Sequence, residues 1–345
     1  MLLACFPELV PPDGLTDNPY RDYDGDGFSV SEGDCDDDDP SRYPPDACDT
    51  GIQTDADTDT DADTDTDSDA DADTDADTDA DTDVLQAEHL YVAELHLNAV
   101  YRIRLSDQDV VPVVTKLSDP EGVAVDRRQG LLLWADSTTG QVGQANLDGS
   151  DPGVFATSAG VGHVDAVSDG ASGTVCWVGA STTVVHCAMQ DGTEFLAHST
   201  QSSTRSVAID AAGGWVYWSE PTEIRRVRFD GSGDEQVVAG LHEPAGLVLE
   251  PNGARMFWIE QTTGFARVAT ALKDGTEPTT IAEGGLNGPA GAAYDPATDW
   301  VYFTNTGENR IERVHSDGTG REVFVDSTTI GGLNEPREVA LDYAY

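Results

Sequence analysis

A short aromatic segment recurs six times between residues 85 and 345, and this repeat limits the possible folds more than any other feature of the chain. Each copy ends in an acidic residue, except that Gly179 and Asn305 take its place in two of them. The copies are Tyr91–Glu94, Leu133–Asp136, Cys176–Gly179, Tyr217–Glu220, Phe257–Glu260 and Tyr302–Asn305. Their last residues are 42, 43, 41, 40 and 45 positions apart. A period of this length is typical of a repeat architecture in which each repeat is one supersecondary unit.

Two further elements share the period. An apolar run ending in an acid precedes five copies and follows the last: Val123–Asp126, Ala166–Asp169, Val207–Asp210, Leu247–Glu250, Ala292–Asp295 and Val339–Asp342. An Asp-Gly pair, which marks a tight turn, follows the later copies: Leu147–Gly149, Gln190–Gly192, Phe229–Gly231, Lys273–Gly275 and Ser316–Gly318, with Leu105–Asp107 as a degenerate first copy. Each period therefore holds four short strands, and the sequence predicts an all-β fold, a six-bladed β-propeller over 85–345.

The phase of the repeat predicts how the ring closes. The region begins with an aromatic second strand and ends with an apolar first strand, Val339–Asp342. We expect this last strand to complete the first blade, because an unpaired strand edge at the seam would favour association with other chains.

The fourth repeat carries a resemblance to a known family. Trp215–Glu220, Ile224–Ser232 and Gly240–Leu247 resemble the YWTD, or class B, repeats of the low-density lipoprotein receptor family. The resemblance covers 85–345 and implies a binding module. It also implies that the acids ending the aromatic segments brace neighbouring blades, so the blades with Gly179 and Asn305 are expected to be looser.

Two cysteines fall within one blade. Cys176 and Cys187 lie on its second and third strands, with their midpoint at the intervening turn. We predict a disulfide between them that braces the blade lacking the acid at Gly179; the alternative is a pair of free, buried thiols.

Charge excludes several classes of protein. The chain has 18 basic and 65 acidic residues, a net charge of −47, which repels phosphate and anionic lipid and argues against nucleic-acid binding. No apolar run reaches the roughly 18 residues that a membrane-spanning helix needs. Between 54 and 83 every second residue is Asp, alternating with Thr, Ala or Ser. Neither face of this segment is apolar, so 54–84 is predicted to be a disordered linker.

An acidic module is predicted at 22–53. Carboxylates at loop positions 1, 3 and 5 followed by Gly27 open like a calcium loop, but Gly33 occupies position 12 where an EF-hand has Glu. The stretch resembles the Asp-rich metal-binding motif of myxobacterial surface proteins and, more loosely, the thrombospondin type 3 repeat; the matching residues are 24–28, 32–40, Pro44 and Cys48.

The resemblance implies a bound metal ion. Residues 1–84 hold no His and no Met beyond Met1, so the donors are oxygens and favour Ca²⁺. The predicted ligands are Asp22, Asp24, Asp26, Glu32, Asp34, Asp36, Asp37 and Asp39. Cys35 and Cys48 are predicted to form a disulfide that closes this loop; the alternative to a metal site is a solvated acidic loop.

The first residues resemble the end of a bacterial lipoprotein signal. In Met1–Cys5 the lipidated residue would be Cys5, although no apolar region precedes it, and 1–21 is interpreted as a truncated signal remnant with an N-terminal segment. Paired cysteines favour an oxidising compartment. We therefore expect an exported bacterial protein, secreted or held at the outer membrane or cell surface, whose membrane contact is through Cys5 alone.

One face of the propeller is predicted to bind the ligand. It carries the loops entering each innermost strand and the hairpins joining second and third strands. The expected entry positions are Glu121, Val164, Arg205, Ala245, Ala290 and Arg337, with His163, Asp165 and Glu338 beside them. Arg205 and Arg337 are candidates for pairing with a carboxylate or an acidic partner. The alternative is an ordinary solvated rim.

Two functions compete. The first is a binding or scaffold protein for a protein or glycan partner, with no catalytic residue. The second is a lactone hydrolase resembling gluconolactonases, which hold a divalent metal ion in the channel with Glu, Asn and Asp. Three of the six entry positions are Val or Ala and two are Arg, which argues against such a metal cage. No Gly-x-Ser-x-Gly nucleophile motif is present. The sequence therefore favours binding, with a structural surface-layer role as a third possibility.

Overall fold

The computed structural model describes residues 87–342 apart from 127, 158–160, 169–172, 180–182, 252 and 329–332. Val84–Tyr345 forms one compact unit. The predicted calcium motif, the 54–84 linker, Cys5 and the Cys35–Cys48 pair lie outside the described residues and stay predictions. Among the described residues no helix is long and apolar enough to cross a bilayer.

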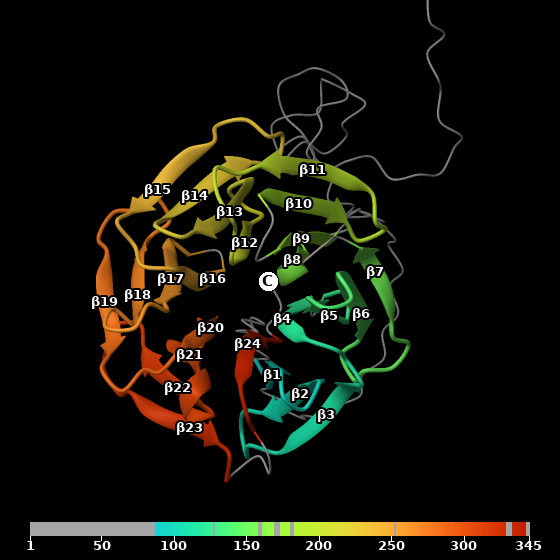
Figure 1. Cartoon of the computed structure of the whole chain (residues 1–345), viewed down its shortest axis with the longest axis vertical. Coiled ribbons are helices and arrows are strands. Elements are labelled where there is room, and N and C mark those ends of the chain that lie inside the picture. Colours follow the sequence, from blue (N-terminus) through green and yellow to red (C-terminus); the bar gives the residue numbers. More distant parts are fainter. Residues whose placement is uncertain are drawn as a thin grey trace, which may run out of the picture. The chain divides into compact units, whose positions relative to one another are not determined.

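The strands form six four-stranded antiparallel sheets around one axis, which confirms the predicted six-bladed propeller (Figure 1). Blade 1 comprises β24 (Pro336–Leu341), β1 (His89–Glu94), β2 (Ala99–Arg104) and β3 (Val110–Thr115). Blade 2 comprises β4 (Pro120–Asp126), β5 (Leu131–Asp136), β6 (Gln141–Asn146) and β7 (Gly153–Thr157). Blade 3 comprises β8 (Val161–Ser168), β9 (Gly173–Gly179), β10 (Val184–Met189) and β11 (Glu194–Ser199).

The other three blades follow the same order from the axis outward. Blade 4 comprises β12 (Val207–Asp210), β13 (Trp215–Glu220), β14 (Glu223–Arg228) and β15 (Glu235–Ala239). Blade 5 comprises β16 (Pro244–Leu249), β17 (Arg255–Glu260), β18 (Arg267–Leu272) and β19 (Thr279–Glu283). Blade 6 comprises β20 (Pro289–Asp295), β21 (Trp300–Asn305), β22 (Arg310–His315) and β23 (Glu322–Asp326), with a 3₁₀ turn at Thr306–Glu308.

The ring closes as the phase of the repeat predicts. In Figure 1 the red β24 lies beside the blue-green β1, and Val92 pairs with Val339. The carboxylate of Asp342 accepts hydrogen bonds from the backbone N–H groups of Glu88 (2.7 Å) and His89 (2.8 Å). The last described residues of the chain thus fix the first ones in place.

Burial explains why the aromatic segments form second strands. Strand β17 is buried along almost its whole length, whereas the outermost strand β19 of the same blade is partly exposed. Side chains from facing sheets pack in shared clusters, and one of them joins Tyr217 of blade 4 to Leu247 and Trp258 of blade 5. A strand covered by sheets on both faces reads as a continuous apolar run, and the core therefore lies between neighbouring blades.

In five of the six blades the side chain that ends the aromatic strand binds the loop that enters the same blade. Asp136 accepts a hydrogen bond from the backbone N–H of Ser118, 18 residues upstream (2.8 Å). Asn305 makes the same contact with the N–H of Asn287 (2.8 Å), and its Nδ2 donates to Glu312 (2.7 Å). Asn305 therefore keeps the contact that the acids make, because an amide oxygen accepts this hydrogen bond as a carboxylate does, and the looseness of blade 6 stays a prediction.

Blade 3 has no side chain at the equivalent position, Gly179. The predicted disulfide between Cys176 and Cys187 is present there, joining directly opposed residues of β9 and β10. The hydroxyl of Thr204 donates to the carbonyl oxygen of Gly179 (3.4 Å), so the chain entering blade 4 contacts the end of this strand.

Candidate functional site

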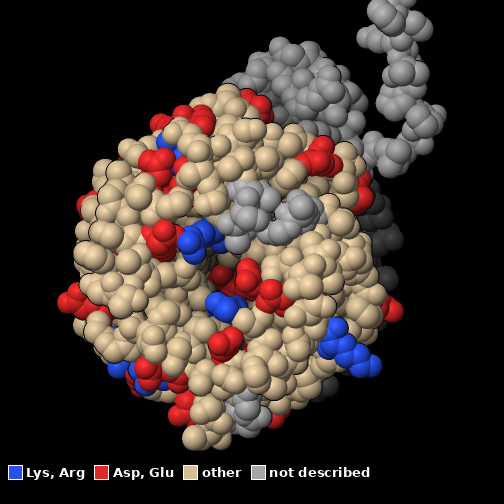
Figure 2. All heavy atoms as spheres, in the orientation of Figure 1, with Lys and Arg blue, Asp and Glu red and all other residues tan. Residues whose placement is uncertain are grey.

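The mouth of the central channel forms a depression of about 180 Å³. The face shown in Figure 2 is hollowed at its centre, where charged groups of both signs lie. Seven of the nine residues predicted for the ligand face line this depression: Glu121, His163, Arg205, Ala245, Ala290, Arg337 and Glu338. The structure thus brings together residues at or just before the starts of the innermost strands of all six blades.

The entry position of blade 3 is Gly162, which lines the mouth, and the expectation of Val164 there was wrong. Val164 pairs with Trp177 as Val123 pairs with Trp134 in blade 2, and Val164 is buried. The entry position expected from the sequence was thus two residues too late in this blade.

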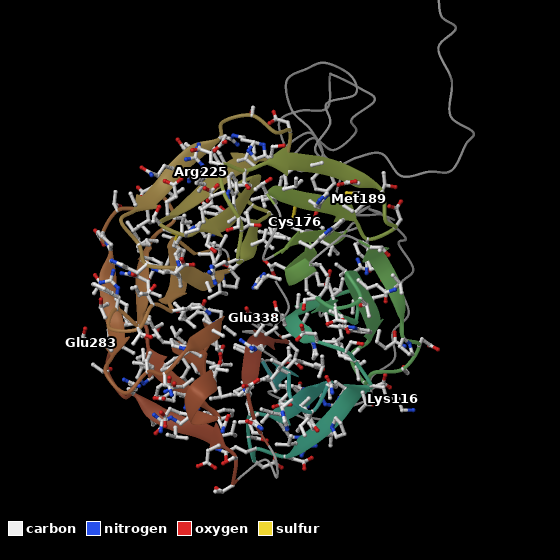
Figure 3. The ribbon with its side chains drawn as sticks, in the orientation of Figure 1. Lys116, Cys176, Met189, Arg225, Glu283 and Glu338 are labelled. Atoms are coloured by element: carbon white, nitrogen blue, oxygen red, sulfur yellow. A yellow bond between two sulfur atoms is a disulfide. The ribbon has the colours of Figure 1, made fainter. Side chains whose placement is uncertain are left out.

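His163 and Glu338 form the floor of the mouth. His163 Nε2 lies 2.9 Å from Glu338 Oε2, and only 8% of each side chain is exposed. The two residues come from β8 and β24, so the pair spans blade 2, and Figure 3 places Glu338 near the axis of the ring. Both also line a smaller compartment of about 50 Å³, so the pair lies between the two cavities. A ligand entering from the mouth therefore meets a buried histidine–carboxylate pair.

The floor is held to its neighbours by backbone hydrogen bonds. The N–H of Val207 on β12 donates to His163 Nδ1 (3.3 Å), and the N–H of Ala292 on β20 donates to Glu338 Oε1 (3.2 Å). Burial alone lowers the pKa of His163, but the carboxylates of Glu338 and Asp165 outweigh it and raise that pKa above the usual value.

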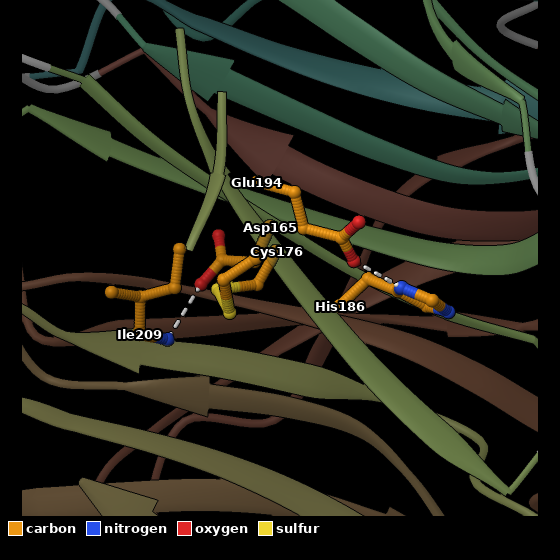
Figure 4. The surroundings of a disulfide bond; sticks show 6 residues. Asp165, Cys176, His186, Glu194 and Ile209 are labelled. Atoms are coloured by element: carbon orange, nitrogen blue, oxygen red, sulfur yellow. Dashed lines mark hydrogen bonds and ion pairs between the residues drawn. A yellow bond between two sulfur atoms is a disulfide. The ribbon is translucent and has the colours of Figure 1, made fainter. Parts of the chain in front are cut away.

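Asp165, which the sequence also placed on the ligand face, lies below the floor and lines the smaller compartment. Its carboxylate accepts the backbone N–H of Ile209 (2.9 Å), and it pairs with the disulfide-bonded Cys176 (Figure 4). The structure therefore assigns Asp165 a contact between blades 3 and 4 and does not place it at the mouth.

The two arginines at the mouth differ in their partners. Arg205 forms an ion pair with Glu243 and donates to Gln261 Oε1 (3.3 Å), and both charged side chains are about 40% exposed. Arg337 has a buried Nε without a hydrogen-bond partner among the described residues. A buried guanidinium N–H without a partner is unfavourable, and the same side chain lines the open mouth.

Glu121 adds a carboxylate to the same wall. Burial, together with the nearby charge of Asp119, raises its pKa, and the charges of Arg337 and Arg205 offset part of this rise. The described residues contain no group of three or more His, Cys, Asp or Glu placed to hold a metal ion.

Sequence reasoning missed Glu243, the partner of Arg205. The signal was present, because Glu243 precedes Pro244 at the start of the innermost strand, as Glu335 precedes Pro336. Glu243 has a φ of +55°, and this left-handed backbone shapes the entry loop at the rim of the mouth.

Comparisons with known proteins agree with this fold. No family model matches the chain. The human low-density lipoprotein receptor-related protein 5-like protein is 24% identical over 204 residues, 57% of this chain and 79% of that protein. Mouse low-density lipoprotein receptor-related protein 5 is 30% identical over 100 residues, 28% of this chain but only 6% of the relative.

Solved structures show the same architecture. A Bacteroides caccae protein of unknown function has a TM-score of 0.57 at 14% identity, covering 74% of this chain and 98% of that one. TolB from Acinetobacter baumannii has a TM-score of 0.56 at 12% identity, covering 74% and 66%. A Xanthomonas campestris gluconolactonase has a TM-score of 0.51 at 17% identity, covering 69% and 86%. At these identities the likeness shows the fold alone. The chain is thus a six-bladed β-propeller similar in sequence to low-density lipoprotein receptor-related protein 5-like protein.

Proposed function

We propose that the propeller is a binding module that docks a protein partner on the face around the channel mouth. The observation that carries this proposal is Arg337, which lines an open depression and whose Nε has no hydrogen-bond partner in the part of the chain that the structure describes. The sequence likeness to a receptor-related protein supports a binding role.

The mouth suits an acidic or amide side chain of the partner. Such a group would approach Arg337 from above and stop at the His163–Glu338 floor. A carboxylate accepts two parallel hydrogen bonds from a guanidinium, which adds geometric specificity to charge attraction. Arg205 is already paired with Glu243, so it contributes by holding the rim of the mouth in shape.

Substituting Arg337 tests the proposal. We expect Arg337→Ala to weaken binding of the partner by roughly tenfold to a hundredfold, the loss of one or two charge-assisted hydrogen bonds. The full chain is immobilised, partners are captured from envelope and secreted extract, and each affinity is then measured by biolayer interferometry with the purified partner. The Arg205→Ala/Arg337→Ala variant should lose at least as much.

Arg228→Ala is the matched control, because this arginine stacks on Trp215 (4.4 Å to the ring centroid) and does not line the mouth. A partner bound equally by wild type and Arg337→Ala contradicts docking at the mouth. Turnover of a gluconolactone that Arg337→Ala abolishes would instead establish the hydrolase interpretation.

For the N-terminal module, we propose Ca²⁺ binding by the Asp22–Asp39 carboxylates, supported by the spacing of the acids and of Gly27. Isothermal titration of the full chain should show a saturable, chelator-reversible heat that Asp24→Asn/Asp26→Asn removes. The control, Asp57→Asn/Asp59→Asn, removes the same charge from the linker and should leave that heat unchanged. Equal isotherms for all three proteins would exclude a site at this motif.

A further inference from the structure

The hairpin of blade 5 differs from its counterparts in length. The connections between second and third strands are 95–98, 137–140, 180–183, 221–222, 261–266 and 306–309. The blade 5 hairpin is thus the longest of the six, with six residues against four or two. Added loop length on a rigid scaffold is where binding functions concentrate, and this hairpin lies on the face of the channel mouth.

The added residues present an aromatic ring to solvent. Phe265 is 55% exposed, the highest fraction among the large hydrophobic side chains of the described residues. Its N–H donates to the carbonyl oxygen of Thr262 (2.8 Å), and Gly264 at φ +87° supplies a backbone that other residues rarely adopt. The turn therefore holds the ring away from the core.

The ring is supported from one side. It stacks on His242 with centroids 4.0 Å apart and planes within 3°. His242 is fixed in turn by the fully buried Glu260, which lies 3.1 Å from His242 Nδ1 and accepts the His242 backbone N–H (3.0 Å). One face of Phe265 is thus covered by a fixed imidazole, and substantial ring area remains exposed.

Planar polar groups lie next to this stack. Gln261, four residues before Phe265, contacts Arg205, and Arg205 pairs with Glu243, the residue after His242. We call Arg205, His242, Glu243, Gln261 and Phe265 the aromatic platform.

The platform fits a sugar ring better than an apolar peptide. Hot spots of protein interfaces are large side chains clustered in well-packed, desolvated pockets, but the other exposed large hydrophobic side chains that the structure describes, Leu97, Val154 and Val323, lie on blades 1, 2 and 6. A pyranose combines an apolar C–H face, which stacks on an aromatic ring, with hydroxyl groups at its edge. Those hydroxyls can donate to Glu243 or Gln261 and accept from Arg205, so no polar group need lose water without a replacement.

We infer that the aromatic platform is a carbohydrate-binding subsite that takes a neutral pyranose unit stacked on Phe265. It deepens the proposed function by adding a ligand class beside the mouth, and it rests on that function only in sharing the same face. Arg337 is not part of the platform, so the two sites are separable by substitution.

Saturation-transfer difference NMR tests this with the full chain and three probes: cellohexaose, maltohexaose and chitotetraose at millimolar concentration. We expect at least one probe to receive saturation mainly at ring C–H protons. Phe265→Ala and Phe265→Leu should weaken binding by about tenfold or more, Phe265→Trp should retain it, and the exposed-residue control Val154→Ala should match wild type.

The leucine variant separates the two ligand classes, because leucine keeps an apolar surface but offers no flat ring. The inference is overturned if Phe265→Leu binds the probe as well as wild type does, or if none of the three probes receives saturation. It is also overturned if an apolar peptide alone displaces a bound probe from Phe265. Arg337→Ala should bind the probe normally. If Arg337→Ala loses partner binding but still binds the sugar, both sites are supported. If the wild-type protein binds the partner but no sugar, only the platform is overturned.

Discussion

Removing residues 336–345 will abolish cooperative unfolding of the propeller. The deletion takes away β24, the innermost strand of blade 1, together with the buried side chains of Val339 and Leu341. It also removes Asp342, whose carboxylate holds the N–H groups of Glu88 and His89. Circular dichroism during heating measures the result: a broad transition or none, in place of a single sharp one.

The size of the effect follows from what the strand buries. Each large apolar side chain contributes about 1.5–3 kcal/mol on burial, and hydrogen bonds to a charged group about 1.5–3 kcal/mol. The deletion also uncovers the edge of β1 and the cluster that joins blades 1 and 6. These losses together are comparable to the roughly 5–15 kcal/mol that stabilises a typical domain.

A shorter deletion provides the control. Removing 343–345 keeps β24 and Asp342 and should leave the melting temperature nearly unchanged. If the chain lacking 336–345 melts as sharply and at the same temperature as the shorter deletion, ring closure by β24 does not determine stability.

The repeat alone predicted the number of blades, the strand order and the closing strand, because each depends on local patterning that recurs at a fixed period. The Cys176–Cys187 disulfide was predictable for the same reason, since two strands joined by a short hairpin face each other residue by residue. The register of strand β8 could not be predicted in this way, and Gly162 occupies the position expected for Val164.

Contacts across the ring could not be predicted from the sequence. His163 and Glu338 are 175 positions apart and meet only because β8 and β24 both face the axis. The pairing of Arg205 with Glu243, and the buried Nε of Arg337, likewise depend on how three entry loops converge. The 261–266 hairpin can be read from the sequence, but the stacking of Phe265 on His242 depends on how this hairpin and the loop that enters blade 5 are placed in the fold.

Replacing Glu338 by alanine will destabilise the propeller by about 2–5 kcal/mol, because a hydrogen bond to a charged group is lost and a buried N–H loses its acceptor. The variant leaves His163 buried without the carboxylate that lies 2.9 Å from its Nε2, and the N–H of Ala292 loses its acceptor. Chemical denaturation of Glu338→Ala, His163→Ala and the double variant measures the coupling. Glu283→Ala, an exposed carboxylate on the outer rim (Figure 3), is the control and should change stability by less than about 0.5 kcal/mol.

The His163–Glu338 pair also predicts the direction in which the stability of the propeller changes with pH. The pKa of His163 is raised in the folded protein, so the folded state keeps a proton that the unfolded chain releases. The stabilisation is complete below the unfolded pKa of about 6.5 and is lost as the pH rises through the folded pKa. The stability difference between wild type and His163→Ala should therefore shrink from mildly acidic to mildly alkaline pH. In Glu338→Ala the NMR-measured pKa of His163 should fall, because Asp165 alone remains to oppose burial. An unchanged His163 pKa, or a double variant whose loss equals the sum of the single losses, would show that the two side chains are not coupled.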